Sequence, residues 1–223
     1  EIVRLAFKGE KLFYKGKRHD LPKPGGEGKA IRLDFPPTDI PIFLATLAPK
    51  SLEYTGASAD GWLGTSFSPD YADAHLAHIR AGAEAAGRSI QEIELHVACP
   101  VAIGERVEQM VEARRYGVAF SMGAMGSRTT NFYNDALQRA GFMDDAKAIQ
   151  NLWLAGKRDQ ATKRVPDEMV TKYGAIGTPE MVLERFRLYR DVGIASLTLR
   201  LDVEDEQEKI GLLEQIVDLL NHL

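Results

Sequence analysis

Residues 40–65 read IPIFLATLAPKSLEYTGASADGWLGT, and this stretch gives the clearest signal of how the chain folds. Two apolar runs without strict alternation, at 40–45 and 62–65, flank a segment that starts at Pro49, suits a short helix and ends near Gly56. Strands that are buried on both faces and joined by a helical crossover are typical of parallel βαβ units. We therefore predict a strand, a helix and a second strand, with both strands in one parallel sheet.

The turn after the first predicted strand is a candidate phosphate site. It reads Ala45-Thr46-Leu47-Ala48-Pro49 and leads directly into the predicted helix. Unpaired backbone N–H groups and the helix macrodipole attract phosphate at a helix N-terminus, and the Thr46 hydroxyl would add a donor. Most strand-to-helix turns in α/β proteins bind nothing, so the turn alone is a weak signal.

Composition and charge narrow the class of protein. The 223 residues, 44% of them apolar and 27% charged, predict one globular domain that spans 1–223. A net charge of −4 without a Lys/Arg cluster gives no reason to expect a nucleic-acid partner. No apolar run approaches the roughly 20 residues of a membrane span, and we expect no signal peptide. We predict a cytoplasmic location, with the single Cys99 as an inert buried thiol.

The first residues have the spacing of an amphipathic helix that has already begun. Apolar side chains recur at helical intervals from Ile2 to Phe7, and no capping residue precedes them. We therefore expect this chain to be a fragment of a longer protein. Loop composition dominates from 14 to 37, with room for one short hairpin.

Helices and strands alternate along the rest of the chain. The predicted elements are a helix over 68–87, a strand over 93–103, a helical region over 105–173, a helix over 178–192 with Thr178 as its N-cap, a strand over 195–201 and a helix over 204–223. Four strand–helix units imply a parallel sheet and amount to half of a (β/α)8 barrel, which typically needs about 250 residues. A doubly wound sheet usually carries glycines in its first turn, and 45–49 has none. We predict the C-terminal half of a TIM barrel, with a helical insertion at about 105–173.

Five short motifs follow one another along nearly the whole chain. They are Pro41-Ile42-Phe43-Leu44-Ala45 with Pro49-Lys50, Ala59-Asp60-Gly61-Trp62, Met125-Gly126-Ser127 with Asn131-Phe132-Tyr133, Gly141-Phe142, and Gly177-Thr178-Pro179-Glu180. In order and spacing they resemble the carboxy-terminal part of the luciferase-like flavin- or deazaflavin-dependent oxidoreductases. The similarity is greatest to the branch that uses coenzyme F420 and includes methylene-tetrahydromethanopterin reductases.

The resemblance implies a cofactor site at the carboxyl ends of the barrel strands, where F420 or, alternatively, FMN would bind. Ala45, Thr46, Leu47 and Ala48 would contact the cofactor phosphate, and Gly64 and Thr65 would line the same region. Family members often have glycine at the positions of Leu47 and Ala48, so this chain would rely on backbone N–H groups there. The residues around the cofactor ring would lie on strands that this chain lacks, which leaves its catalytic residues unknown.

The function implied by the resemblance is hydride transfer between reduced F420 and an organic substrate. An FMN-dependent monooxygenase of the same fold is the alternative within the family. A non-catalytic binding or scaffold fragment is a hypothesis from a different class, and we expect the chain alone to show negligible turnover. A small α/β hydrolase is disfavoured because no Gly-x-Ser-x-Gly motif occurs.

The glycine-rich segment 122–127, MGAMGS, is a candidate for a helix break over the mouth of the barrel. It lacks the Lys-Ser/Thr of a P-loop and does not follow a predicted strand. Phe120, Met122 and Met125 would then line a substrate pocket, with packing between helices as the alternative. Arg200, near the end of the last strand, would meet a phosphate or an acidic group of the substrate, or else pair with Asp202 or Glu204.

The histidines give no metal site. His75 and His78 lie three residues apart with Asp73 nearby, but no third ligand is evident, and we predict that both lie on a solvated helix face. His96 lies in a strand, either as a satisfied core histidine or as a pocket residue. The expected partners are a small-molecule substrate and, because a half barrel leaves two strand edges open, a second copy of the chain or the missing N-terminal segment.

Overall fold

The computed structural model describes all residues, 1–223, and they divide into two compact units, Glu1–Ile42 and Phe43–Leu223. Each unit is described by itself. The expectation of a single domain over the whole chain stays a prediction.

The first unit consists mostly of loops. It contains helix α1 (Ile2–Phe7) and an antiparallel hairpin of β1 (Tyr14–Lys15) and β2 (Asp20–Leu21). The Phe7 carbonyl accepts a hydrogen bond from the Thr38 N–H at 2.9 Å, and the Phe7 ring lies 6.5 Å from that of Phe35. The predicted opening helix and the short hairpin are therefore confirmed.

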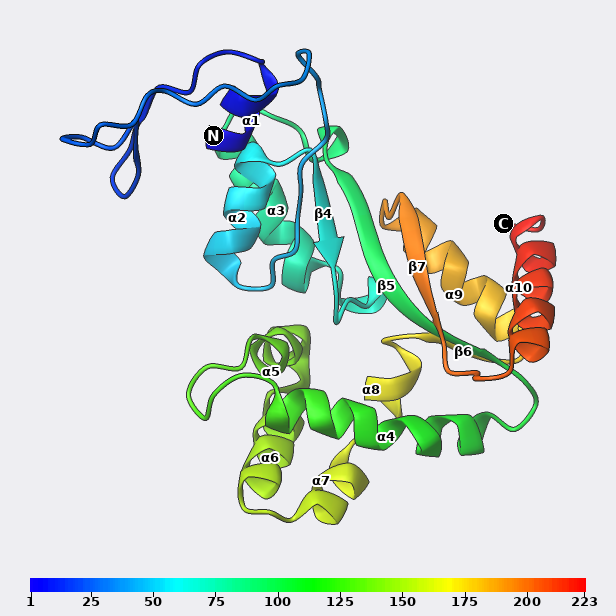
Figure 1. Cartoon of the computed structure of the whole chain (residues 1–223). Coiled ribbons are helices and arrows are strands. Elements are labelled where there is room, and N and C mark those ends of the chain that lie inside the picture. The colour runs from blue at the N-terminus through cyan, green and yellow to red at the C-terminus, as the bar shows by residue number, and fades with distance from the viewer. The chain divides into compact units, whose positions relative to one another are not determined.

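The second unit is built on a five-stranded parallel sheet (Figure 1). Its strands are β3 (Phe43–Leu44), β4 (Gly61–Gly64), β5 (Glu94–Ile103), β6 (Ala175–Gly177) and β7 (Ser196–Leu201). β5 is central, because β4 pairs with its residues 94–97, β6 with 101–103 and β7 with 96–101. Since β7 overlaps in register with both β4 and β6, those two strands share the other edge of β5. The sheet is open, and half of a barrel stays a prediction.

Helices cover one face of this sheet and one end of it. Their bounds are α2 (Pro49–Ser58), η1 (Pro69–Tyr71), α3 (Asp73–Ala85), η2 (Ile90–Glu92), α4 (Val107–Ala124), α5 (Phe132–Leu137), the π-helical η3 (Gln138–Phe142), α6 (Met143–Leu154), α7 (Arg158–Arg164), α8 (Asp167–Thr171), α9 (Pro179–Asp191) and α10 (Glu206–Leu220). Helices α4 to α8 gather at the end of the sheet to which the β4 arrow points (Figure 1). None of the helices combines the length and the hydropathy that crossing a bilayer requires.

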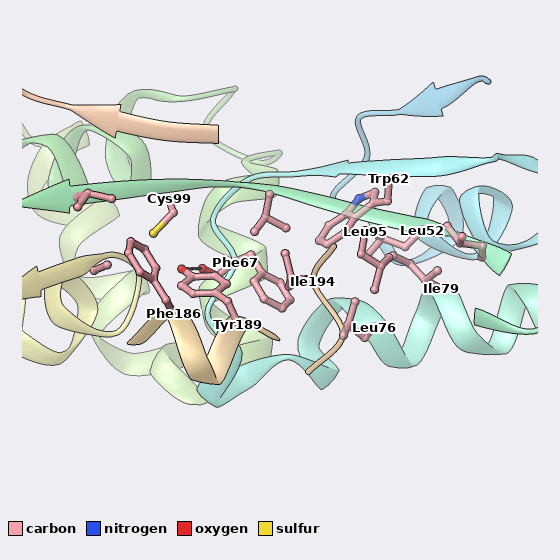
Figure 2. Packing of buried hydrophobic residues seen from close by; sticks show 14 of the residues in the cluster. Leu52, Trp62, Phe67, Leu76, Ile79, Leu95, Cys99, Phe186, Tyr189 and Ile194 are labelled. Atoms are coloured by element: carbon pink, nitrogen blue, oxygen red, sulfur yellow. Dashed lines mark hydrogen bonds between the residues drawn. The ribbon is translucent and has the colours of Figure 1, made fainter. Parts of the chain in front are cut away.

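The two faces of β5 have different partners. Leu95, Val97, Cys99 and Val101 are almost completely buried in the cluster formed with the helices that cover the sheet. Figure 2 shows Leu95 and Cys99 on one side of the strand, together with side chains of α3 and α9 such as Ile79 and Phe186. The intervening residues are only half-buried or exposed, so β5 alternates between a helix-covered face and an open face.

Helices α2 and α3 pack through two glycines. A Cβ at Gly56 would lie 1.9 Å from the Ile79 carbonyl oxygen, and one at Gly82 would lie 1.8 Å from the Glu53 carbonyl oxygen. Neither backbone can give way to a side chain, so only glycine permits this close approach. The Gly56 carbonyl also accepts a hydrogen bond from Arg88 at 3.0 Å.

The helix signals read from the sequence are confirmed, whereas the strands need two corrections. The Thr178 hydroxyl accepts from the Met181 N–H at 3.4 Å and caps α9, whose first residue is Pro179. The predicted strand at 40–45 shortens to β3, because only its residues 43–44 pair with β4 and Pro41 has no N–H to donate. The three-residue β6, directly before Thr178, was not predicted.

The solvated helix face predicted for both histidines of α3 is wrong for His75. His75 is 1% exposed, and its ring lies 5.6 Å from that of Trp62 and 5.8 Å from that of Phe67. Burial is the main reason that the pKa of His75 falls to about 4, and the positive charge of Arg139 adds to the effect. His78 stays partly exposed, 3.6 Å from the Glu53 carboxylate. His75 differs because it shares the apolar stripe of α3 with Ile79.

Protonation of His75 should couple folding to pH. Its pKa is about 4 in the folded protein, below the ordinary histidine value of 6.5, so the unfolded chain binds the proton more readily. The neutral His75 ring contributes on the order of 3 kcal/mol to the free energy of unfolding above pH 6.5, and this contribution is lost as the pH falls towards 4. We expect His75→Phe to reduce the loss of urea-unfolding free energy between pH 6.5 and 4. His78→Phe is the control; equal slopes for wild type and both variants would contradict this account.

Candidate functional site

A cavity of about 510 Å³ lies where the carboxyl ends of β4 and β7 and the open face of β5 meet helices α4, α5 and α8. Thr65 and Ser66 follow β4, Ala98 and Pro100 come from β5, and Arg200 comes from β7. Apolar side chains of the helices close the opposite side: Val118, Met122, Leu137, Met169 and Val170. In α/β proteins with parallel strands, ligands bind at this carboxyl edge.

All four residues predicted for a substrate pocket line this cavity. Phe120 and Met122 lie on α4, Met125 follows that helix, and Arg200 lies across the cavity on β7. Met122 is buried, whereas the Phe120 side chain is 43% exposed and packs edge-on against Trp153. The structure thus brings these residues together with Thr65, and their contact with a substrate stays a prediction.

Two buried asparagines hold the end of α4 beside the cavity. Asn131 caps α5 by accepting from the N–H groups of Tyr133 and Asn134, and its amide donates to the Met122 carbonyl at 2.9 Å. The Asn134 amide donates to the Met122 carbonyl as well, at 3.1 Å, and to Ala146 at 2.8 Å. These hydrogen bonds therefore hold the connection that follows the end of α4 at Ala124, and they fix where Met122 and Met125 lie.

The turn at 45–48 presents backbone donors at the N-terminus of α2. Ala48 is the N-cap residue and has an extended backbone, and no side chain caps the helix. The N–H groups of Leu47, Ala48 and Lys50 have no acceptor within the protein. Unpaired N–H groups at a helix start are the donors that a phosphate uses.

The Thr46 hydroxyl is not one of those donors, which corrects the expectation from the sequence. The Thr55 hydroxyl donates its proton to the Ser51 carbonyl at 2.9 Å. The 2.8 Å hydrogen bond between the Thr46 and Thr55 hydroxyls must therefore use the Thr46 proton. The Thr46 carbonyl is occupied too, because it accepts from the Trp62 indole at 3.0 Å.

A positive charge that the sequence analysis did not single out lies beside this turn. Arg139, from η3, donates through Nη2 to the Leu47 carbonyl at 2.8 Å and through Nε to the Ala74 carbonyl at 3.3 Å. The guanidinium is part-buried, and burial lowers its pKa, although an arginine stays charged. Nothing in the local sequence around Arg139 indicates this contact, since it joins segments far apart in the chain.

Thr65 and Gly64 occupy different surroundings. Thr65 lines the cavity, whereas a Cβ at Gly64 would lie 2.5 Å from the Trp62 ring. Gly64 is therefore buried against the core and does not line the cavity, and neither do Ala45, Thr46, Leu47 or Ala48. The cofactor-binding role of these six residues stays a prediction.

Ser66 is a cavity residue that sequence reasoning missed. Its φ of 51° is the only positive φ among the non-glycine residues of the chain. Such a conformation costs on the order of 1 kcal/mol or more and is concentrated at functional sites. Its position directly after a predicted strand was the one available signal.

His96 turned out to link two strands. Its two ring nitrogens form hydrogen bonds with the hydroxyls of Ser196 and Thr198 on β7, which lies beside β5. The half-buried His96 ring lies on the same face of β5 as Ala98 but does not line the cavity. The sequence left open whether His96 is a satisfied core histidine or a pocket residue. The structure agrees better with the first, because both ring nitrogens are hydrogen-bonded, although His96 lies outside the core.

A cluster of charged and phenolic groups near η1 ties this turn to α8 and α9. Arg185 forms an ion pair with Asp70, and Lys172 lies 2.7 Å from Glu168 and 3.7 Å from Asp70. Burial raises the pKa of Asp70, but the hydrogen bond and charge of Arg185 outweigh burial, so the pKa is lowered overall. Tyr71 donates to Glu168 at 2.7 Å. These contacts account for all the charged groups of the cluster, whose role is to hold η1 against α8 and α9.

These features define a parallel α/β protein with a pocket between the carboxyl edge of its sheet and a helical insertion. A profile of the family described as luciferase-like monooxygenase matches residues 1–196. The chain belongs to this family. The resemblance inferred from the motifs is therefore confirmed, and so is the α/β, TIM-barrel-like fold class.

Relatives in sequence carry the names of oxidoreductases, and one of these names refers to coenzyme F420. Rv3520c of Mycobacterium tuberculosis, provisionally named a coenzyme F420-dependent oxidoreductase, is 27% identical over 228 residues, which cover 98% of this chain and 63% of that protein. The 5,10-methylenetetrahydromethanopterin reductase of Archaeoglobus fulgidus is 26% identical over 214 residues, with 94% of this chain and 60% of the relative covered. The chain thus spans about three fifths of the length of these curated relatives.

Solved structures share the fold. The coenzyme F420-dependent tetrahydromethanopterin reductase of Methanopyrus kandleri superposes with a TM-score of 0.71 at 22% identity, over 95% of this chain and 58% of that chain. An F420-dependent secondary alcohol dehydrogenase gives a TM-score of 0.66 at 16% identity, over 97% and 58% of the two chains. At these identities the likeness shows the fold alone.

Proposed function

We propose that the protein is an F420-dependent oxidoreductase that transfers a hydride between the reduced deazaflavin and a small organic substrate. The observation that carries the proposal is the set of free N–H donors of Leu47, Ala48 and Lys50, with Arg139 beside them. They lie at the carboxyl edge of the same sheet whose strands line the cavity. Relatives whose names state a dependence on F420 support the choice of cofactor.

The residues of this chain suit the phosphate of such a cofactor. Three N–H groups at the start of the ten-residue helix α2 supply hydrogen bonds and the positive end of the macrodipole. The Arg139 guanidinium adds a full positive charge at the turn, and its bond to the Leu47 carbonyl holds the turn in place. Thr65 and Gly64, at the end of the neighbouring strand, complete the proposed cofactor region.

The cavity would hold the substrate. Phe120, Met122 and Met125 supply apolar contacts and keep water away from the reacting atoms, and Arg200 orients the substrate from the strand side. When bound, F420 supplies a hydride at its C5, which is chemistry that the cofactor carries itself. The chain contributes binding and orientation, and no residue in it is assigned as a proton donor or acceptor.

An FMN-dependent monooxygenase is the second candidate function. A riboflavin lyase structure with a modified FMN shares the fold with a TM-score of 0.56 at 15% identity. The phosphate of FMN would meet the same N–H groups. A binding module that retains the phosphate contacts without catalysis is the remaining alternative. We further propose that the protein forms a homodimer and is located in the cytoplasm.

Titration of the chain with F420 and with FMN, followed by the fluorescence of each cofactor, tests this function. We expect F420 to bind with micromolar affinity and FMN more weakly. Tighter binding of FMN would favour the second candidate function. The proposal would be overturned if neither cofactor bound with a Kd below 1 mM, which corresponds to a binding free energy of about −4 kcal/mol.

Arg139→Gln tests the phosphate contact. We expect FMN to bind the wild-type chain more tightly than riboflavin, which has the same ring and no phosphate. Arg139→Gln should lower the affinity for FMN about tenfold, on the order of 1.4 kcal/mol, and leave the affinity for riboflavin unchanged. Arg187→Gln, on α9, removes the same charge away from the turn and should have no effect. An equal loss for FMN and riboflavin would assign Arg139 a structural role only.

A further inference from the structure

The cavity has an uneven charge distribution. Among its lining residues only Arg114, Arg200 and Asp202 are charged, so the wall carries one positive charge in excess. These three residues lie together at the carboxyl end of β7 and the facing part of α4. The remaining surface is mostly apolar, with the methionines on the helix side.

Arg114 lines the cavity, and one of its buried nitrogens has no hydrogen-bond partner. Its Nη2 lies 2.9 Å from the Asp202 carboxylate, and its Nη1 donates to the Met110 carbonyl at 3.2 Å. Its Nε is buried and has no hydrogen-bond partner. Buried donors of a charged group are almost always paired, so this N–H calls for an acceptor that occupies the cavity.

Arg200 is exposed and has no ion-pair partner. The sequence left open whether Arg200 would pair with Asp202 or Glu204, and the structure pairs Asp202 with Arg114 instead. No carboxylate lies within ion-pair distance of Arg200. Because Arg200 stands opposite Pro100 in the register of β7 and β5, and both residues line the cavity, its guanidinium belongs to the cavity wall.

We propose that the cavity takes an organic substrate with an apolar body and an anionic group, a carboxylate or a phosphate, which Arg200 and the Nε of Arg114 bind. This specifies the substrate class of the proposed oxidoreductase and to that extent rests on the proposed function. A planar guanidinium suits an anion with two oxygens. Met122 and Met125, which are flexible and polarisable, adapt to the apolar part.

The same anion chemistry has a second source, the phosphate of the cofactor. The turn at 46–48, to which we assign that phosphate, does not line the cavity. Arg200 should therefore discriminate between substrates without affecting the phosphate dependence of cofactor binding. The two sources are separated by testing one variant against both kinds of ligand.

Isothermal titration of the full chain with octanoate and with 1-octanol tests the inference. These probes share an apolar body that fits the cavity and differ in the charge of the head group. We expect octanoate to bind at least tenfold more tightly than octanol. Arg200→Gln should lower the affinity for octanoate about tenfold and leave the affinity for octanol unchanged. Arg200→Lys should restore part of the affinity for octanoate, and Arg187→Gln should have no effect on either probe.

Three results would overturn the inference: equal affinities for octanoate and octanol, no binding of octanoate at 10 mM, or an Arg200→Gln variant that binds octanoate as tightly as wild type. A loss of FMN binding with unchanged riboflavin binding in Arg200→Gln would assign the cavity anion to the cofactor and would also overturn it. Discrimination of octanoate from octanol in a chain that binds neither F420 nor FMN would retain the anion site and refute only the proposed function. Thermal unfolding of each variant shows that it is folded.

Discussion

The strand β5 is the constraint on which the rest of the second unit depends. Its ten residues pair with three other strands, and its side chains alternate between two environments. One set, from Leu95 to Val101, is buried under α3 and α9 and anchors the core. The other set includes Ala98 and Pro100, which form the floor of the cavity. A shift of the strand by one residue would exchange the two faces and remove both the core and the pocket.

The cavity arises because the chain leaves the sheet after Ile103 and returns only at Ala175. The helices between these points form a second apolar cluster around Met122, Ile149 and Met169, separate from the cluster that covers the sheet. Asn131 and Asn134 tie the end of α4 into it, and Arg139 connects it to the turn before α2. The insertion therefore both closes the cavity and places a cation at the proposed phosphate site.

Features that depend on local sequence could be predicted, and features that depend on distant pairing could not. The start of α9 at Thr178-Pro179 and the strand at 93–103 follow from capping and hydrophobicity, which are local properties. β6 consists of three residues and exists because it pairs with the far end of β5. The burial of His75 requires the rings of Trp62 and Phe67, and the Arg114–Asp202 pair joins a helix to the residue that follows β7, far away in the chain. The motif resemblance, by contrast, led to the correct family because it uses the order of many weak local signals.

The proposed function depends most on the contact between the N-terminus of α2 and the cofactor phosphate. The most direct measurement is the shift of the backbone amide signals in ¹⁵N–¹H correlation spectra when F420 is added to the labelled chain. We expect the amides of Leu47, Ala48 and Lys50 to shift downfield as their free N–H groups acquire a charged acceptor. Binding of F420 that leaves these three amides unchanged would contradict the proposed contact.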